Sequence, residues 1–283
     1  MEVIYLIVCI VAGSLQSVCK KQLNARCQNC EFALSALISS FSLIWFLIIT
    51  KDLAFVPALL PYALVFSICY ATAAVTCVLA LNTGSMGLTE LMLAYSAMLP
   101  LLYGIIFLDD PVTIWKILGI ALLLLSFVFT YCRRQGQKFT FRKSWLVYVI
   151  LLFLSNGGCG VVMRMQQKHF AGAFDGTFMV MALVLVVLLL LGVSLLRKEN
   201  VLTALRKGWL FSGLSGLCNG VANYCSLMCL LMIPGTIYYP VSSAGGLTLS
   251  YAISVIAFKE KFTLAQVIGF VLGILSMILV NIS

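Results

Sequence analysis

The 51 residues from Gly208 to Phe258, GWLFSGLSGLCNGVANYCSLMCLLMIPGTIYYPVSSAGGLTLSYAISVIAF, contain no charged side chain. A helix needs about 20 apolar residues to cross the hydrocarbon core of a bilayer. The stretch is too long for one such helix, and Pro234-Gly235 near its middle is a strong turn signal. It therefore predicts two successive membrane-spanning helices.

The same pattern extends in both directions along the chain of 283 residues. Short charged patches separate uncharged stretches, and a second turn signal at Asn82-Thr83-Gly84 divides the long segment that begins at Leu53. The predicted fold class is therefore an all-α integral membrane protein with ten transmembrane helices. Besides the two spans above, these are Val3–Cys19, Phe32–Thr50, two helices formed by Leu53–Thr89 with Leu91–Leu108, Ile117–Cys132, Ser144–Met163, Gly176–Leu196 and Phe262–Ser283.

The overall composition supports this class and excludes others. The chain is 63% hydrophobic and 10% charged, with a mean hydropathy of +1.11, whereas soluble domains are about 45–50% apolar and about 25% charged. A soluble enzyme, a disordered regulator and a nucleic-acid-binding domain are therefore excluded. The net charge of +9 lies in patches beside apolar stretches, which is typical of membrane anchors rather than of a nucleic-acid surface.

The two halves of the sequence correspond. Each half is predicted to hold five helices, with residues 1–133 as the first repeat, 134–143 as a basic connecting loop and 144–283 as the second repeat. Because five is odd, the second repeat enters the membrane in the opposite orientation, a plan common in transporters. Matching residues, at an offset of 150 and then of 144 nearer the start, are Asp110 with Glu260, Thr113 with Thr263, Gly119 with Gly269, Ser126 with Ser276, Gly13 with Gly157, Lys20 with Arg164 and Gln22 with Gln166.

Two segments resemble a known family. Gly87–Tyr131, with its acidic loop, Pro111-Val112-Thr113 and Gly119, resembles the end of an EamA repeat, and so does Tyr238–Val280. The chain as a whole thus resembles the drug/metabolite transporter superfamily, EamA type. The resemblance implies an inverted pair of five-helix repeats and transport of amino acids, nucleobases, drugs, choline or other small metabolites. It also implies cytoplasmic termini, which many members have.

The loop charges predict the other orientation. With ten spans, 14 of the 18 basic residues lie on the side opposite the termini. Short basic loops stay in the cytoplasm, so the charges favour external termini and a cytoplasmic loop at 134–143. The first segment lacks a basic start and a small-residue cleavage site, so it is expected to be a retained helix. The expected location is the plasma membrane.

Glu90 is the only acid deep within an apolar stretch. Charges inside a membrane are costly and usually functional, so Glu90 is a candidate to bind a cationic solute or to carry a coupling proton. The alternative is a carboxylate stabilised by the helix macrodipole, about one turn from the helix start. Lys20 and Arg164 are expected to be snorkelling anchors at helix ends, with pairing to an anionic solute as the alternative.

Uncharged polar and aromatic residues supply further candidates. Asn219 and Asn223 lie four residues apart on one helix face, and Gly216 and Gly220 form an adjoining face suited to close helix contact. The asparagines are expected either to contact solute or to join helices. The remaining candidates, which come from matching helices or form aromatic and small-residue patches, are Gln16, Asn156, Tyr70, Tyr95, Tyr238, Tyr239, Tyr251, Ser242 and Ser243.

These observations predict a secondary active transporter of a small organic solute, working by alternating access. No phosphate-binding loop or nucleophile elbow is present, and Cys27-x-x-Cys30 lacks the second ligand pair of a zinc site, so neither catalysis nor a cofactor is expected. The site is expected between the first, third, fourth, sixth, eighth and ninth helices. Expected partners are the solute, the lipid bilayer and a proton or another coupling ion, with a monomer or homodimer as the assembly. The alternatives are a multidrug or quaternary-cation exporter and a non-transporting or lipid-handling protein.

Overall fold

The structure is a computed structural model that describes residues 2–26, 30–50, 53–84, 86–107, 113–131, 143–171, 173–233, 235–258 and 264–279. Within these ranges the chain is helical and contains no strand. The prediction of an all-α protein is thus confirmed. Several predicted features lie outside the described residues: the acidic loop at 109–111, the basic loop at 134–142, the turn proline at 234, and Cys27.

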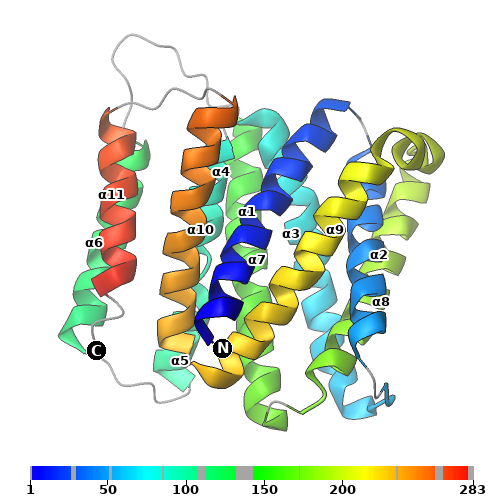
Figure 1. The fold of residues 1–283 in the computed structure, drawn as a ribbon, viewed down its shortest axis with the longest axis horizontal. Coiled ribbons are helices and arrows are strands. Elements are labelled where there is room, and N and C mark those ends of the chain that lie inside the picture. Colours follow the sequence, from blue (N-terminus) through cyan, green and yellow to red (C-terminus); the bar gives the residue numbers. More distant parts are fainter. Residues whose placement is uncertain are drawn as a thin grey trace.

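Figure 1 shows the helices in their order along the chain. Seven helical segments, with α4 and α5 counted as one, are long and apolar enough to cross a membrane, so the chain is a multi-pass membrane protein. The described residues thus support seven membrane-spanning segments, and the total of ten stays a prediction. The elements are α1 (Glu2–Arg26), α2 (Glu31–Ile49), η1 (Pro57–Leu59), α3 (Leu60–Thr83), α4 (Met86–Tyr95), α5 (Met98–Phe107), α6 (Ile114–Tyr131), α7 (Lys143–Phe170), α8 (Asp175–Leu196), α9 (Val201–Met232), α10 (Gly235–Phe258) and α11 (Leu264–Leu279).

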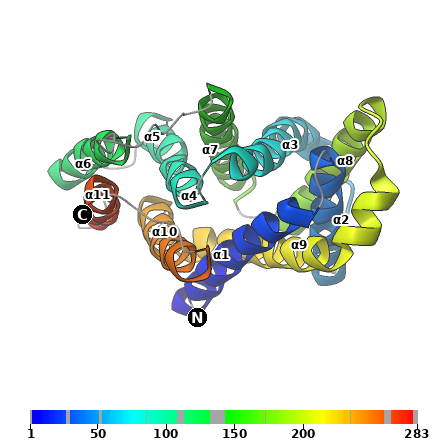
Figure 2. The same ribbon diagram turned by 90° about the horizontal axis from the view of Figure 1, so that it is seen from above.

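The helices lie in two facing rows, with α6, α5, α7 and α3 along one side and α11, α10, α1 and α9 along the other (Figure 2). Viewed from above, α6 and α11 pair at one end, α4, α5 and α10 come next, and α1, α2, α3, α7, α8 and α9 form the larger bundle (Figure 2). Within this bundle α1 and α2 pack on α9, and α3 packs on α7 and α8. The start of α1 and the end of α11 lie at the same edge of the molecule (Figure 1).

The outer surface is apolar, as a lipid-facing surface must be. Large side chains such as Ile4, Ile48, Ile68, Leu188 and Leu196 are exposed on several helices. An exposed apolar surface of this extent marks an interaction with membrane or protein. The same helices keep serines and asparagines on their inner faces, among them Ser14, Ser42, Ser67 and Asn219. The polarity is therefore inverted relative to a soluble bundle.

Small residues and hydroxyl groups hold α2 against α9. A Cβ at Gly216 would collide with the Ile38 carbonyl oxygen and Phe41, and one at Gly220 would lie 2.7 Å from Trp45. The Ser42 hydroxyl donates a hydrogen bond of 2.7 Å to the Gly216 carbonyl. Close backbone approach and interhelical hydrogen bonds drive helix association in lipid. The expected close-contact role of the Gly216 and Gly220 face is thus observed.

A carboxylate in the connection between α8 and α9 accepts hydrogen bonds from backbone N–H groups at the start of α2. The first backbone N–H groups of a helix have no partner within that helix. Glu199 accepts from the Phe32 N–H at 3.4 Å and from the Ala33 N–H at 2.7 Å. The Ser194 hydroxyl donates to the same carboxylate at 3.1 Å. This carboxylate therefore fixes α2 relative to α8 and α9.

The fourth predicted span is broken into α4 and α5, which meet at Ser96-Ala97. Pro100 explains the break, because proline lacks a backbone N–H and its ring clashes with the carbonyl four residues earlier. That carbonyl belongs to Ser96, and it accepts from the Leu99 N–H at 3.1 Å instead. Polar backbone at the break is thereby placed in the interior of the molecule, next to α7.

Two hydrogen bonds join α6 to α11 in a reciprocal pattern. The Ser126 hydroxyl of α6 donates to the Gly269 carbonyl of α11 at 2.6 Å. The Ser276 hydroxyl of α11 donates to the Gly119 carbonyl of α6 at 2.7 Å. These are the same serines and glycines that match at an offset of 150 in the sequence. The two helices therefore pair through equivalent residues.

Candidate functional site

Three adjoining cavities lie between the helices, with volumes of about 230, 220 and 200 Å³. Asn156 and Leu93 line all three. The first and second cavities also share Gln16 and Lys20. The three adjoining spaces are together called the central cavity. Ligand sites in proteins are usually mostly apolar hollows with a few placed polar groups, and this cavity has that character.

Eight helices line the central cavity. They are α1, α2, α3, α4, α5, α7, α9 and α10. These include all six helices from which the site was expected. The contribution of α2, through Ser35, Ile38 and Ser39, was not expected. Within the described ranges, α6, α8 and α11 supply no lining residue.

The structure gathers most of the predicted site residues. Those that line the central cavity are Gln16, Tyr70, Glu90, Asn156, Asn219, Asn223, Tyr238, Tyr239, Ser242 and Ser243. Tyr95 is 2% exposed and does not line the cavity. Its hydroxyl bonds to the Ser126 hydroxyl at 2.5 Å, so it links α4 to α6. The side chain of Tyr251 lies outside the described part of the chain.

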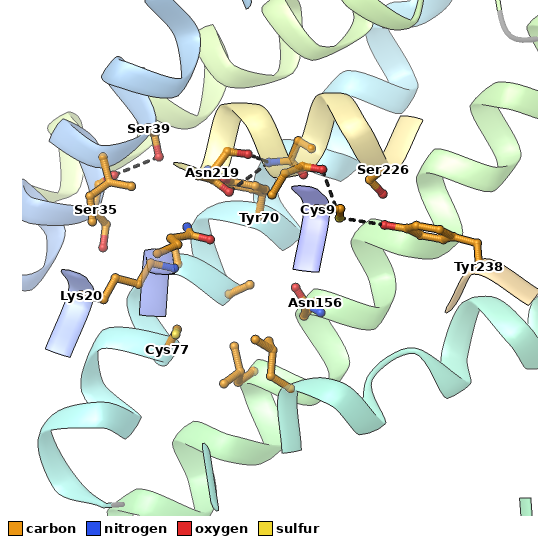
Figure 3. A pocket seen from close by; sticks show the side chains of 18 residues that line it. Cys9, Lys20, Ser35, Ser39, Tyr70, Cys77, Asn156, Asn219, Ser226 and Tyr238 are labelled. Atoms are coloured by element: carbon orange, nitrogen blue, oxygen red, sulfur yellow. Dashed lines mark hydrogen bonds between the residues drawn. The ribbon is translucent and has the colours of Figure 1, made fainter. Parts of the chain in front are cut away.

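One wall of the cavity is a hydrogen-bonded network centred on Asn219 (Figure 3). The Asn219 amide donates to the Ser42 hydroxyl at 3.0 Å and to the hydroxyl of Tyr70. The Asn223 amide donates to the side-chain and backbone oxygens of Asn219, both at 3.0 Å. Asn219 thus joins α9 to α2 and α3, and Asn223 also forms a hydrogen bond with Tyr70 of α3. The expected role in joining helices is observed for Asn219, and contact of the pair with solute stays a prediction.

The opposite wall carries Asn156 and the break between α4 and α5. The Asn156 amide donates a 2.6 Å hydrogen bond to the Ser96 hydroxyl, which lies at that break. A Cβ at Gly160 would lie 2.9 Å from Pro100, so α7 approaches α5 closely there. The Tyr239 hydroxyl donates to the Gly160 carbonyl at 3.4 Å, which connects α10 to the same wall. In Figure 3, Asn156 faces the Asn219 network across the cavity.

One face of α1 lines the cavity, and only part of it was predicted from the sequence. Cys9, Gly13, Gln16 and Lys20 are spaced by four, three and four residues, which places them on one helix face. This spacing of small and polar residues in the sequence would have indicated that one face of the helix lines the cavity. The Cys9 thiol lies 3.3 Å from the hydroxyl of Tyr238, so α1 contacts α10 beside the cavity.

Lys20 does not lie at a helix end as expected. The helix α1 continues to Arg26, six residues or about 9 Å further at 1.5 Å per residue. Nothing between Lys21 and Arg26 breaks a helix, and Leu23 is fully buried. Lys20 therefore lines two of the three spaces, and Figure 3 shows it at the end of the cavity away from Tyr238. Arg164 likewise lies inside α7, where its guanidinium donates to the Pro100 carbonyl at 3.1 Å.

Glu90 lies in the first part of α4 and lines the same space as Lys20. It is 8% exposed. The Ser17 hydroxyl of α1 forms a hydrogen bond with its carboxylate, and Lys20 interacts with it electrostatically. Its Oε1 atom is buried with no hydrogen-bond partner among the described residues. A buried carboxylate oxygen without a partner is costly in free energy, so this atom is a candidate ligand contact.

Comparison with known proteins identifies the fold and no family. No family model and no curated protein matches the chain. Among solved structures 27 chains match. One of them, described only as "Crystal structure of protein", has a TM-score of 0.72 at 15% identity, covering 98% of this chain and 94% of that chain. At this identity the likeness concerns the fold alone.

Proposed function

We propose that the protein is a secondary active transporter of a small organic solute, with the central cavity as its binding site. The observation that supports this most is the cavity itself. Polar side chains from seven helices converge in the interior of a molecule whose exterior is apolar. Polar groups within a membrane commonly mark solute or ion pathways.

The proposal includes ten spans arranged as two inverted repeats. The reciprocal bonds of Ser126 and Ser276 to the opposite helix support it, because a two-fold relation between halves generates equivalent contacts. The packing of α1 on α9 and of α7 on α3 supports it in the same way. Alternating access would then be a rocking of one half against the other around the cavity. The same proposal includes that the protein is a transporter of the EamA type.

A second candidate function is export of organic cations, which Glu90 and the tyrosines Tyr70, Tyr238 and Tyr239 favour. Lys20 in the same cavity weighs against a site for a purely cationic solute. The third alternative, a lipid-handling protein, requires a path from the cavity to the bilayer. The first proposal is preferred because the cavity is lined by both an acidic and a basic side chain, Glu90 and Lys20.

The test is solute flux in proteoliposomes. A thermal-shift screen of the purified protein against amino acids, amines, nucleobases and quaternary ammonium compounds selects the solutes, and exchange of radiolabelled solute measures flux. Saturable flux that protein-free liposomes lack is the expected result. Stable, correctly assembled protein that moves none of these solutes would refute the transporter function. The orientation is tested separately, since flux does not depend on it.

A further inference from the structure

The cavity holds an acidic and a basic side chain, Glu90 and Lys20, that form no ion pair with each other. Lys20 comes from α1 and Glu90 from α4, and both line the space of about 220 Å³. They interact electrostatically but form no ion pair within 4.0 Å. A transporter for neutral solutes has no need of either charge, and each is costly to place in a membrane interior.

The geometry points to a zwitterion as the solute, and we propose that Glu90 and Lys20 select it by binding its ammonium and its carboxylate. This inference rests on the proposed transport function. The Oε1 atom of Glu90 is buried without a partner among the described residues, so a solute ammonium would supply the hydrogen bonds it lacks. Lys20 has an ammonium group with three donors for a solute carboxylate.

The rest of this space suits a compact solute. Two of its lining residues, Gly13 and Gly246, have no atom within 4 Å of the place where a Cβ would stand. Ile10, Leu93, Ala94 and Leu247 add apolar surface. A volume of about 220 Å³ with a charged pair and an apolar wall fits a molecule of amino-acid size. The class of solute is thus a small molecule with an ammonium and a carboxylate near one end and an apolar group at the other.

Two rival roles for the charged pair predict different results. If Lys20 serves only as the counterion of Glu90, neutral and zwitterionic solutes bind alike. If Glu90 carries a coupling proton, its removal changes the pH dependence of flux and leaves solute selectivity unchanged. These cases are separated by comparing solutes that share one carbon skeleton and differ only in their charged groups.

The experiment uses L-leucine and L-phenylalanine, each beside its amide, which keeps only the ammonium, and its N-acetyl form, which keeps only the carboxylate. Binding is measured by thermal shift and by competition in flux. The wild type is expected to prefer each zwitterion at least tenfold over both capped forms. Glu90→Gln should bring the N-acetyl form close to the zwitterion, and Lys20→Met should do the same for the amide. Lys21→Met, at a neighbouring position that does not line the cavity, is the matched control and should keep the wild-type preference.

The outcomes are distinguishable from failure of transport itself. Flux of other solutes without preference for zwitterions would overturn the zwitterion site and leave the transporter function standing. Equal binding of capped and uncapped forms, or an altered pH profile of flux in Glu90→Gln with unchanged selectivity, would also overturn it. The unliganded melting temperatures of all variants show whether each is folded. Loss of folding stability would weaken the binding of all solutes. It would not remove the preference over the N-acetyl form in Glu90→Gln and the preference over the amide in Lys20→Met.

Discussion

Filling the cavity from Gly246 tests whether solute passes through it. An added Cβ at this position of α10 meets no atom within 4 Å, so a larger side chain enters open space without displacing the packing at its base. Gly246 lines the space that also holds Glu90 and Lys20. Gly246→Leu is therefore expected to block the cavity while the fold remains intact.

The magnitude follows from the volumes. A leucine side chain has four carbons, each comparable with a water molecule whose share of the liquid is about 30 Å³, so it fills about half of a space of about 220 Å³. A solute that loses contact with two methylene-sized groups loses about 1.6 kcal/mol at about 0.8 kcal/mol each, and about 1.4 kcal/mol is tenfold in affinity. We expect flux at low solute concentration to fall at least tenfold.

The folded state should not be weakened by the substitution. Glycine in a helix interior is about 0.8–1.0 kcal/mol less favourable than alanine, and leucine is close to alanine. Gly192→Leu is the matched control, because Gly192 also meets no atom within 4 Å of an added Cβ and is exposed on α8 away from the cavity. Both variants should melt at or above the wild-type temperature. Gly246→Leu that melts normally and transports at the wild-type rate would refute the assignment of the cavity.

Further predictions concern the amide network, the helix pair and the orientation. Asn223→Leu should lower solute affinity with nearly unchanged stability. Asn219→Leu should cost about 1–3 kcal/mol of stability, because two interhelical hydrogen bonds of about 0.6–1.7 kcal/mol each are lost. A larger loss of stability in Asn223→Leu, measured by melting, together with a larger loss of affinity in Asn219→Leu would contradict these roles. Ser276→Ala should lower stability by about 0.6–1.7 kcal/mol, and Ser126→Ala should lower it by more, because the Ser126 hydroxyl also bonds to that of Tyr95. A larger loss of stability in Ser276→Ala would contradict this account of the helix pair. A cysteine at Gln137, in a background without the reactive native cysteines, should resist an impermeant thiol reagent in intact cells because its loop is basic; prompt labelling from outside would assign cytoplasmic termini.

The helix-level prediction succeeded where the signal is local. The turn signals at Asn82-Thr83-Gly84 and Pro234-Gly235 separate helices, since α3 ends at Thr83 and α10 begins at Gly235. The four-residue spacing of Gly216 and Gly220 correctly indicated a contact face. Spacing along one helix and the length of an apolar run are properties of the chain itself. They survive folding because the helix period is constant.

The errors came from features that depend on neighbouring helices. Lys20 was placed at a helix end because charge usually marks the membrane boundary, and only the continuation of α1 to Arg26 shows it inside. Tyr95 and Glu90 lie five residues apart on α4 and therefore on different faces of the helix, but only the packing shows that Glu90 faces the cavity and Tyr95 faces α6. The rotation of a helix about its axis is set by its packing partners, so composition alone does not determine it.

The class of protein, an all-helical chain for a membrane, can be inferred from the amino-acid sequence, because apolar length and loop charge act residue by residue against the bilayer. Most of the polar residues of the site can also be found there, since a polar side chain within an apolar run stands out. Which of these residues lie next to one another is established by the packing of the helices. The cavity around Asn156, the network of Asn219 with Ser42 and Tyr70, and the approach of Lys20 to Glu90 join residues from separate helices. Such contacts exist only after the helices have packed, because their geometry depends on crossing angles and close backbone approach at small residues.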